Sequence, residues 1–154
     1  MISHSDLIQT LRQFMDLAMH HTIHERVHFA KAVGLSMPQL GVLMQLHYRG
    51  NCGVSDISDR FDITNAAASQ MVDKLVQSQL IQREEDPQDR RAKLLNLTEK
   101  ARELMQRNME ERYRWVGQLA KKLTPEERTK VVEALSIMTK AAQELEAESE
   151  APIA

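Results

Sequence analysis

The sequence has few of the residues that define several protein classes. It contains one cysteine, Cys52, five glycines and four prolines among 154 residues. A single cysteine excludes an internal disulfide framework and is typical of proteins kept in a reducing interior. No run of about eighteen apolar residues occurs, and residues 1–6 lack the basic and then apolar pattern of a secretory signal. We therefore expect a cytoplasmic protein with no membrane partner.

An excess of positive charge is also missing. The net charge is −2, and the segment 54–97 carries six Lys and Arg against eight Asp and Glu, which gives 6 − 8 = −2. If this segment binds nucleic acid, the attraction must come from the positions of its bases rather than from their number. Hydrophobic residues make up 42% of the chain, enough for one packed domain, with or without appended helices.

Helical periodicity accounts for most of the chain. Apolar residues recur every three or four positions in six segments, at about 5–31, 36–48, 54–61, 65–78, 98–122 and 124–148. Ser36 with Gln39, and Thr124 with Glu127, have the spacing of capping boxes. Thr64 stands at the N-cap of the helix expected from residue 65. The sequence therefore predicts a mainly α protein with capped helices.

A β-hairpin is predicted between the fourth and fifth of these helices. Two short apolar runs, 80–83 and 94–98, flank the charged segment 86–91, which contains Pro87 and the pair Arg90 and Arg91. An apolar run, a polar turn with proline and a second apolar run are typical of a hairpin with a solvated tip. Helix, turn, helix and hairpin is the order of a winged helix-turn-helix. The predicted fold class is therefore mainly α with a minor β contribution.

The order of these elements also predicts how the chain divides into regions. Residues 36–98 form a compact lobe that could fold alone, and 149–154 form a flexible tail. The long helical segments 1–35 and 99–148 carry apolar stripes that need a partner. In so short a chain the expected partner is a second copy, so these segments are the predicted dimerisation region.

At this point the residues resemble the MarR family of bacterial transcription regulators. The specific matches are Leu35–Leu43, Val72–Leu75, Asp86–Ala92 and Leu97–Lys100. The resemblance implies a homodimer that presents two winged helices to a pseudo-palindromic operator in double-stranded DNA, most simply as a repressor. It also implies that residues 65–78 are the recognition helix, that Arg91 enters a minor groove and that Asp89 orients it. Many members have Thr-Arg where this chain has Ser69-Gln70, and Gly where it has Gln79.

The expected DNA-contacting residues combine the start of the recognition helix with the tip of the wing. Small and polar side chains at the start of a helix allow close approach to base edges, and glutamine can pair with adenine. The alternative for the helix residues is an ordinary exposed side of the helix. The alternative for Arg90 and Arg91 is a solvated turn in which they pair with neighbouring carboxylates. The predicted set is Thr64, Asn65, Ala66, Ser69, Gln70, Lys74, Asp89, Arg90 and Arg91.

A small-molecule effector site is a further implication of the resemblance. The family keeps its effector pocket between the dimerisation helices and the winged lobe, which makes Met19, His47, Tyr113 and Trp115 candidate lining residues. The alternative is that these residues are ordinary core. The sequence does not specify the effector, the operator or the regulated genes, and it leaves repression and activation both open.

Histidines on the first helix raise the alternative of a metal-responsive regulator. His20, His24 and His28 recur every four residues and so share one helical face. The competing interpretation is that these histidines form a polar flank of the first helix, and we expect no metal or other cofactor.

A redox role for Cys52 is a minor alternative. No nucleophile–base pair and no Gly-rich phosphate loop is present, so enzyme activity is not expected. The other alternative function is that of a winged-helix module that binds a protein instead of DNA.

Overall fold

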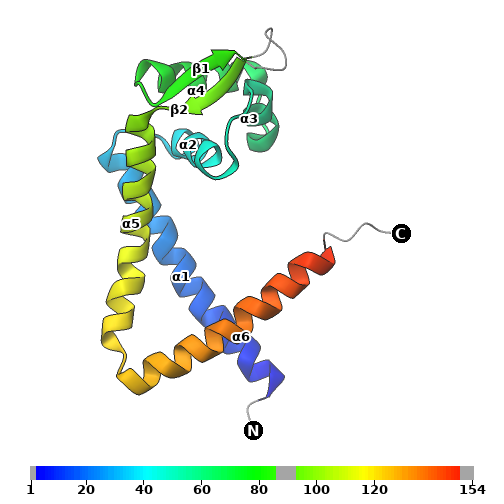
Figure 1. Cartoon of the computed structure of the whole chain (residues 1–154), viewed down its shortest axis with the longest axis vertical. Coiled ribbons are helices and arrows are strands. Elements are labelled where there is room, and N and C mark those ends of the chain that lie inside the picture. The colour runs from blue at the N-terminus through cyan, green and yellow to red at the C-terminus, as the bar shows by residue number, and fades with distance from the viewer. Residues whose placement is uncertain (1–2, 86–92, 150–154) are drawn as a thin grey trace. The chain divides into compact units, whose positions relative to one another are not determined.

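The computed structural model describes residues 3–85 and 93–149. Within these residues the chain forms six helices and one hairpin, in the order that the sequence predicts (Figure 1). Their bounds are α1 His4–Ala32, α2 Met37–Arg49, α3 Val54–Phe61, α4 Asn65–Gln77, β1 Ile81–Glu85, β2 Lys93–Leu97, α5 Glu99–Lys122 and α6 Pro125–Ser149. The mainly α fold with a minor antiparallel sheet is therefore confirmed. The expected wing tip, with Asp89, Arg90 and Arg91, lies outside the described residues, and α6 takes in Ser149, the first residue of the expected tail.

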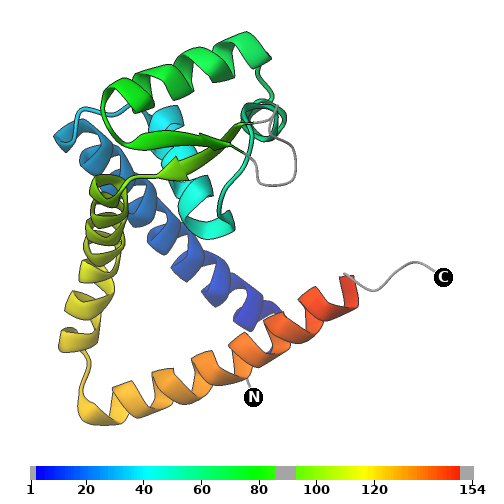
Figure 2. The same cartoon turned by 45° about the horizontal axis from the view of Figure 1, so that its top comes forward.

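The chain divides into two compact units, residues 1–112 and 113–154. In the first unit, β1 pairs antiparallel with β2 in the register Ile81 to Leu97. Figure 2 shows this hairpin beside α4, and β1 contacts α4 while β2 contacts α2. Both strands of the small sheet are thus tied to helices of the lobe, which fixes the base of the wing relative to α4.

The core of the first unit is continuous across the lobe. Leu40, Leu43, Ile57, Leu75 and Leu95 are fully buried and come from α2, α3, α4 and β2. The same cluster takes in Phe29 and Ala30 from the end of α1 and Ala101, Leu104 and Met105 from the start of α5. The ends of these two long helices therefore pack as part of the core that the segment 36–98 forms.

The expected helix starts are confirmed by their hydrogen bonds. At α2, Gln39 N donates to Ser36 Oγ at 3.3 Å and Ser36 N donates to Gln39 Oε1 at 2.9 Å. At α6, Thr124 N donates to Glu127 Oε2 at 2.8 Å and Glu127 N donates to Thr124 Oγ1 at 3.3 Å. Each reciprocal pair satisfies two backbone donors that a helix start would otherwise leave free.

The turns after α3 and α4 hold residues other than glycine at positive φ. α3 is followed by Asp62 (φ 51°) and α4 by Gln79 (φ 59°), whereas α1 and α2 are followed by glycines in this region. After α4, Gln79 N donates to Val76 O and Leu80 N donates to Leu75 O, both at 2.9 Å. This is the paired hydrogen bonding of a Schellman motif, which normally places glycine at the left-handed position.

Replacing Gln79 with glycine is expected to stabilise the protein. A side chain in the left-handed region costs about 1 kcal/mol or more, and glycine removes that cost at a position where the backbone is already fixed. The midpoint of thermal unfolding should rise by about 2–4 °C. Gln77→Gly, inside the same helix, is the control and should lower the midpoint. A lower midpoint for Gln79→Gly as well would show that the Gln79 side chain stabilises this turn.

The second unit exposes most of its apolar side chains. In α6, Val131, Leu135, Met138 and Leu145 are between 39% and 67% exposed, and they follow the stripe expected from the sequence. The start of α6 is joined to the end of α5 by the bond from Arg128 Nε to Ala120 O at 3.0 Å. None of the helices in the described part of the chain is long and apolar enough to span a membrane.

Candidate nucleic-acid interface

The start of α4 is held in place by hydrogen bonds to its own cap and to α3. Thr64 Oγ1 accepts from Ala67 N at 3.2 Å, so the Thr64 hydroxyl serves as the N-cap. The buried Ser58 hydroxyl, in α3, donates to Asn65 Oδ1 at 3.0 Å. Two residues expected to contact DNA therefore also position the helix.

The outward face of α4 consists of small and polar side chains. Ala66, Gln70 and Lys74 are exposed and Ser69 is half-buried, while Ala68, Val72 and Leu75 face the core. The face also includes exposed Ala67, which sequence reasoning did not select. Ala67, Gln70 and Lys74 line a shallow hollow with residues from the start of α2. Since no bulky side chain stands over its first two turns, α4 can approach a groove closely.

The end of α4 is fixed from the start of α5. Thr98 Oγ1 donates to Gln79 O at 2.8 Å, and Lys100 Nζ donates to Ser78 O at 3.0 Å. The ammonium group lies where the negative end of the α4 dipole and its free carbonyls are concentrated. Together with the Ser58 bond at the other end, these contacts restrain both ends of α4 relative to the lobe.

An ion pair that sequence reasoning missed joins α4 to the base of the wing. Arg83 Nη2, in β1, lies 2.6 Å from Asp73 Oδ1, in α4. The charges are ten residues apart and stand on a strand and a helix, so no periodic spacing indicates their contact. Glu84, one of the carboxylates near the wing arginines in the sequence, accepts from Gln82 Nε2 at 2.8 Å and from Asn96 Nδ2 at 2.7 Å.

We predict a measurable but small coupling energy between Asp73 and Arg83. Their side chains are 49% and 35% exposed, so solvent limits the interaction to about 0.5–1 kcal/mol. A double-mutant cycle of Asp73→Ala and Arg83→Ala, read by urea denaturation, measures this value. The matched control is Glu99 with Arg102, which are 3.6 Å apart and more exposed, and their coupling should be near zero. Equal couplings for the two pairs would contradict a positioning role for Asp73 and Arg83.

The candidate metal ligands do not gather into a site. His20, His24 and His28 are all exposed on α1. His24 Nδ1 lies 3.8 Å from Glu25 Oε1, and His21 Nδ1 lies 3.9 Å from the same oxygen. Within residues 3–85 and 93–149, no group of three or more His, Cys, Asp or Glu is placed to hold a metal ion. The geometry of this chain therefore gives no support to a metal-responsive regulator.

The candidate effector residues are distributed over both units. His47 lines a hollow of about 460 Å³ in the first unit, together with Leu97, Gln106 and Met109. Met19 is 58% exposed on α1 and does not line this hollow. Tyr113 and Trp115 belong to the second unit. Within the first unit, the structure therefore does not bring Met19 to the hollow that His47 lines.

Cys52 lies beside the hairpin and is bonded to β2 through its backbone. Its carbonyl accepts from Leu95 N at 2.8 Å, which extends the edge of β2 by one bridge. Burial, followed by the charge of Asp56, raises the pKa of the Cys52 thiol, and the hydrogen bond from Gln45 opposes this only in part. A raised pKa keeps the group in the less reactive thiol form, which argues against a redox role.

Comparisons with known proteins agree with this arrangement. The family model described as MarR family matches residues 35–93. The uncharacterized HTH-type transcriptional regulator YfiV of Bacillus subtilis (strain 168) is 33% identical over 107 residues, which are 70% of this chain and 67% of YfiV.

Solved structures share the fold. Transcriptional regulator Tm0710 from Thermotoga maritima has a TM-score of 0.83 at 19% identity, covering 90% of this chain and 98% of its own. A point mutant of MepR from S. aureus, bound to an oligodeoxyribonucleotide, has a TM-score of 0.65 at 20% identity, covering 92% and 99%. The matched sequence and the winged helix-turn-helix together show that this chain belongs to the MarR family of transcriptional regulators.

Proposed function

We propose that this protein binds a pseudo-palindromic DNA operator as a homodimer, represses transcription by covering it, and is released by a small-molecule effector. The observation that carries the proposal is α4, a helix restrained at both ends whose outward face is small and polar. A restrained helix of this kind can enter a major groove without losing further freedom. A MepR mutant with the same fold is bound to an oligodeoxyribonucleotide, which supports DNA as the ligand.

The second support is the apolar surface that a single chain leaves exposed. In α1, Phe14, Met15, Leu17, Met19 and Ile23 are between 47% and 58% exposed, in addition to the stripe on α6. Exposed large apolar residues in such number mark an interaction surface. A second copy is the simplest partner, because one two-fold axis then covers the same surface on both chains.

Dimerisation sets the geometry of recognition. In a two-fold dimer, the two copies of α4 meet successive major grooves when they lie one helical turn apart, about 34–36 Å. In this mechanism, the dimer fixes the spacing and the wings add contacts to the flanking minor grooves. An effector that binds better to a dimer with another spacing would release the operator.

The contribution of Gln70 tests the recognition-helix assignment. Gln70 is exposed on α4, and its amide can pair with one base edge. Gln70→Ala should relax preference at particular base pairs by about 1–3 kcal/mol, measured as affinities for operators substituted at single positions. Gln77→Ala, at the far end of the same helix, is the control and should leave the preferences unchanged. A uniform loss over all sequences would mean a phosphate contact, and no duplex binding by the unaltered protein at low salt would favour the protein-interaction module.

A further inference from the structure

The turn that follows α4 is bonded to the start of α5 at three successive carbonyl groups. Ser78 O accepts from Lys100 Nζ at 3.0 Å, Gln79 O accepts from Thr98 Oγ1 at 2.8 Å, and Leu80 O accepts from Thr98 N at 3.1 Å. We call these three bonds the α4–α5 clasp. Two of its donors are side-chain groups, so a substitution can remove either of them and leave the backbone intact.

The Thr98 hydroxyl bonds to both helices. It donates to Gln79 O after α4, and it accepts from Ala101 N at 3.2 Å in the first turn of α5. A hydroxyl has one proton to donate and lone pairs with which to accept, so it can make both bonds at the same time. One side chain therefore links the last turn of α4 to the first turn of α5.

The clasp holds a turn that carries backbone strain. Gln79 has φ 59°, and a residue other than glycine keeps such a conformation only where its surroundings determine it. Leu80 and Leu104 line a hollow together with Ser78 and Lys100, and both leucines belong to the buried core. The same turn is thus fixed by hydrogen bonds on its polar side and by packing on its apolar side.

We propose that Thr98 and Lys100 are positioning residues for operator recognition, which hold α4 from α5 in the orientation that reads DNA. In α5, residues 99–112 belong to the first unit and residues 113–122 to the second. The clasp therefore joins α4 to the helix that leads into the proposed dimerisation region. Groups that bind a ligand must be held within about 0.5 Å of their working geometry. The positioning role rests on the proposed function, whereas the clasp itself does not.

The first test needs no DNA. Thr98→Val removes the hydroxyl at nearly constant volume, and Lys100→Gln removes the ammonium group. In each variant of the full-length protein, hydrogen exchange at the amides of residues 78–80, measured by NMR, should become at least about threefold faster because the turn has lost a donor. Exchange at Ala68 N, which is bonded at the start of α4, is the internal control and should change little. Unchanged exchange at residues 78–80 in both variants would overturn the clasp.

The second test measures operator affinity by fluorescence anisotropy in the Gln79→Gly background. Glycine relieves the strained turn, so the stability of this turn depends less on the clasp in that background. If Thr98 positions α4, adding Thr98→Val should still lower operator affinity about three- to tenfold. Adding Thr98→Ser instead, which keeps the hydroxyl, should leave most of the affinity. Full operator affinity of the Thr98→Val variant in this background would show that the hydroxyl only stabilises the turn, and would overturn its positioning role.

Salt dependence distinguishes a positioning role of Lys100 from a direct phosphate contact. Loss of a phosphate contact reduces the slope of log affinity against log salt concentration by about 0.9. As a positioning residue, Lys100 should behave differently: Lys100→Gln should lower operator affinity without changing this slope, and Lys100→Arg should recover most of the affinity. Arg102→Gln removes an exposed cation from the same turn of α5, and this matched control should bind the operator as the unaltered protein does.

The outcomes for the clasp and for the proposed function can be told apart. A slope reduced by about 0.9 in Lys100→Gln would assign Lys100 to the DNA backbone and overturn its positioning role. No duplex binding by the unaltered protein at low salt would contradict the proposed function and the positioning role together. The exchange rates at residues 78–80 would then still decide whether the clasp holds the end of α4.

Discussion

Replacing Leu135 with aspartate is expected to convert the protein into a monomer and to lower operator affinity by about 100-fold or more. Leu135 lies in the apolar stripe of α6 and is 49% exposed in the single chain. A carboxylate there would have to lose its water at the proposed dimer interface without a partner charge. Two linked lobes gain about 10²–10⁴ in apparent affinity over one lobe, and the monomer forfeits this gain. Light scattering gives the mass, and gel-shift titration gives the affinity.

The control for this variant is Glu133→Lys, a larger change of charge on another side of α6. Glu133 is exposed and lies outside the apolar stripe, so the dimer and its operator affinity should be retained. If Leu135→Asp remained a dimer, or bound the operator as a monomer with unchanged affinity, the proposed role of α6 would be wrong.

Replacing Arg91 with alanine should weaken operator binding by about 1–3 kcal/mol while leaving the dimer intact. Arg91 lies outside the described residues, and its role is a proposal from the wing motif. An arginine in a narrow minor groove gains from the concentrated negative potential there, and this gain depends on the flanking sequence. The loss should therefore be largest on operators with A·T-rich flanks, measured by fluorescence anisotropy at fixed salt.

The Arg91→Lys variant distinguishes the contribution of the positive charge to operator affinity from that of the planar guanidinium group. Lysine keeps the positive charge but lacks the planar fork of donors, so it should restore only part of the affinity. Lys93→Ala removes a charge from the exposed start of β2 and serves as the matched control; its effect should not depend on the flanks. An Arg91→Ala loss that is equal on all flanks would assign Arg91 to the phosphate backbone instead of the minor groove.

The sequence predicted the elements of this fold because their signals are local. Capping boxes at Ser36 and Thr124 act over three residues, and the stripe through Ala68, Val72 and Leu75 repeats within one helix. The presence of the hairpin follows from two short apolar runs, although its register, Ile81 with Leu97, does not. What could not be predicted are contacts between elements, such as Asp73 with Arg83, because neither spacing nor composition determines which charged residues meet in space.

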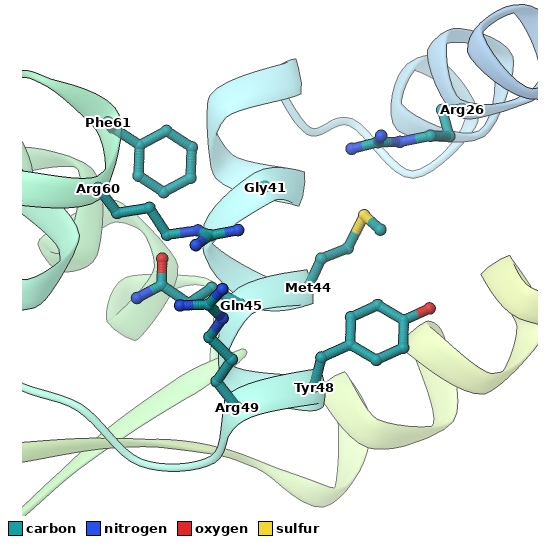
Figure 3. A pocket seen from close by; sticks show the side chains of 8 residues that line it. All are labelled: Arg26, Gly41, Met44, Gln45, Tyr48, Arg49, Arg60 and Phe61. Atoms are coloured by element: carbon teal, nitrogen blue, oxygen red, sulfur yellow. The ribbon is translucent and has the colours of Figure 1, made fainter. Parts of the chain in front are cut away.

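In the candidate site, too, the local features could be predicted and the contacts between elements could not. The exposed positions Ala66, Gln70 and Lys74 follow from helical periodicity, whereas the bond from Ser58 to Asn65 at the start of α4 depends on how α3 packs. The hollow that Arg26, Arg49 and Arg60 line (Figure 3) was not foreseen, because these arginines are separated by 23 and 11 positions along the chain. Only the folded lobe brings these residues to one space.

Selection of bound sites from a pool of random duplexes tests the central claim most directly. A dimer that presents two copies of α4 at a fixed pitch should enrich an inverted repeat whose half-sites are centred about one helical turn apart. Binding of the enriched site should also fall steeply as salt increases, because phosphate contacts release counterions. Enrichment of a single half-site without a spaced repeat, or no enrichment at low salt, would contradict the account.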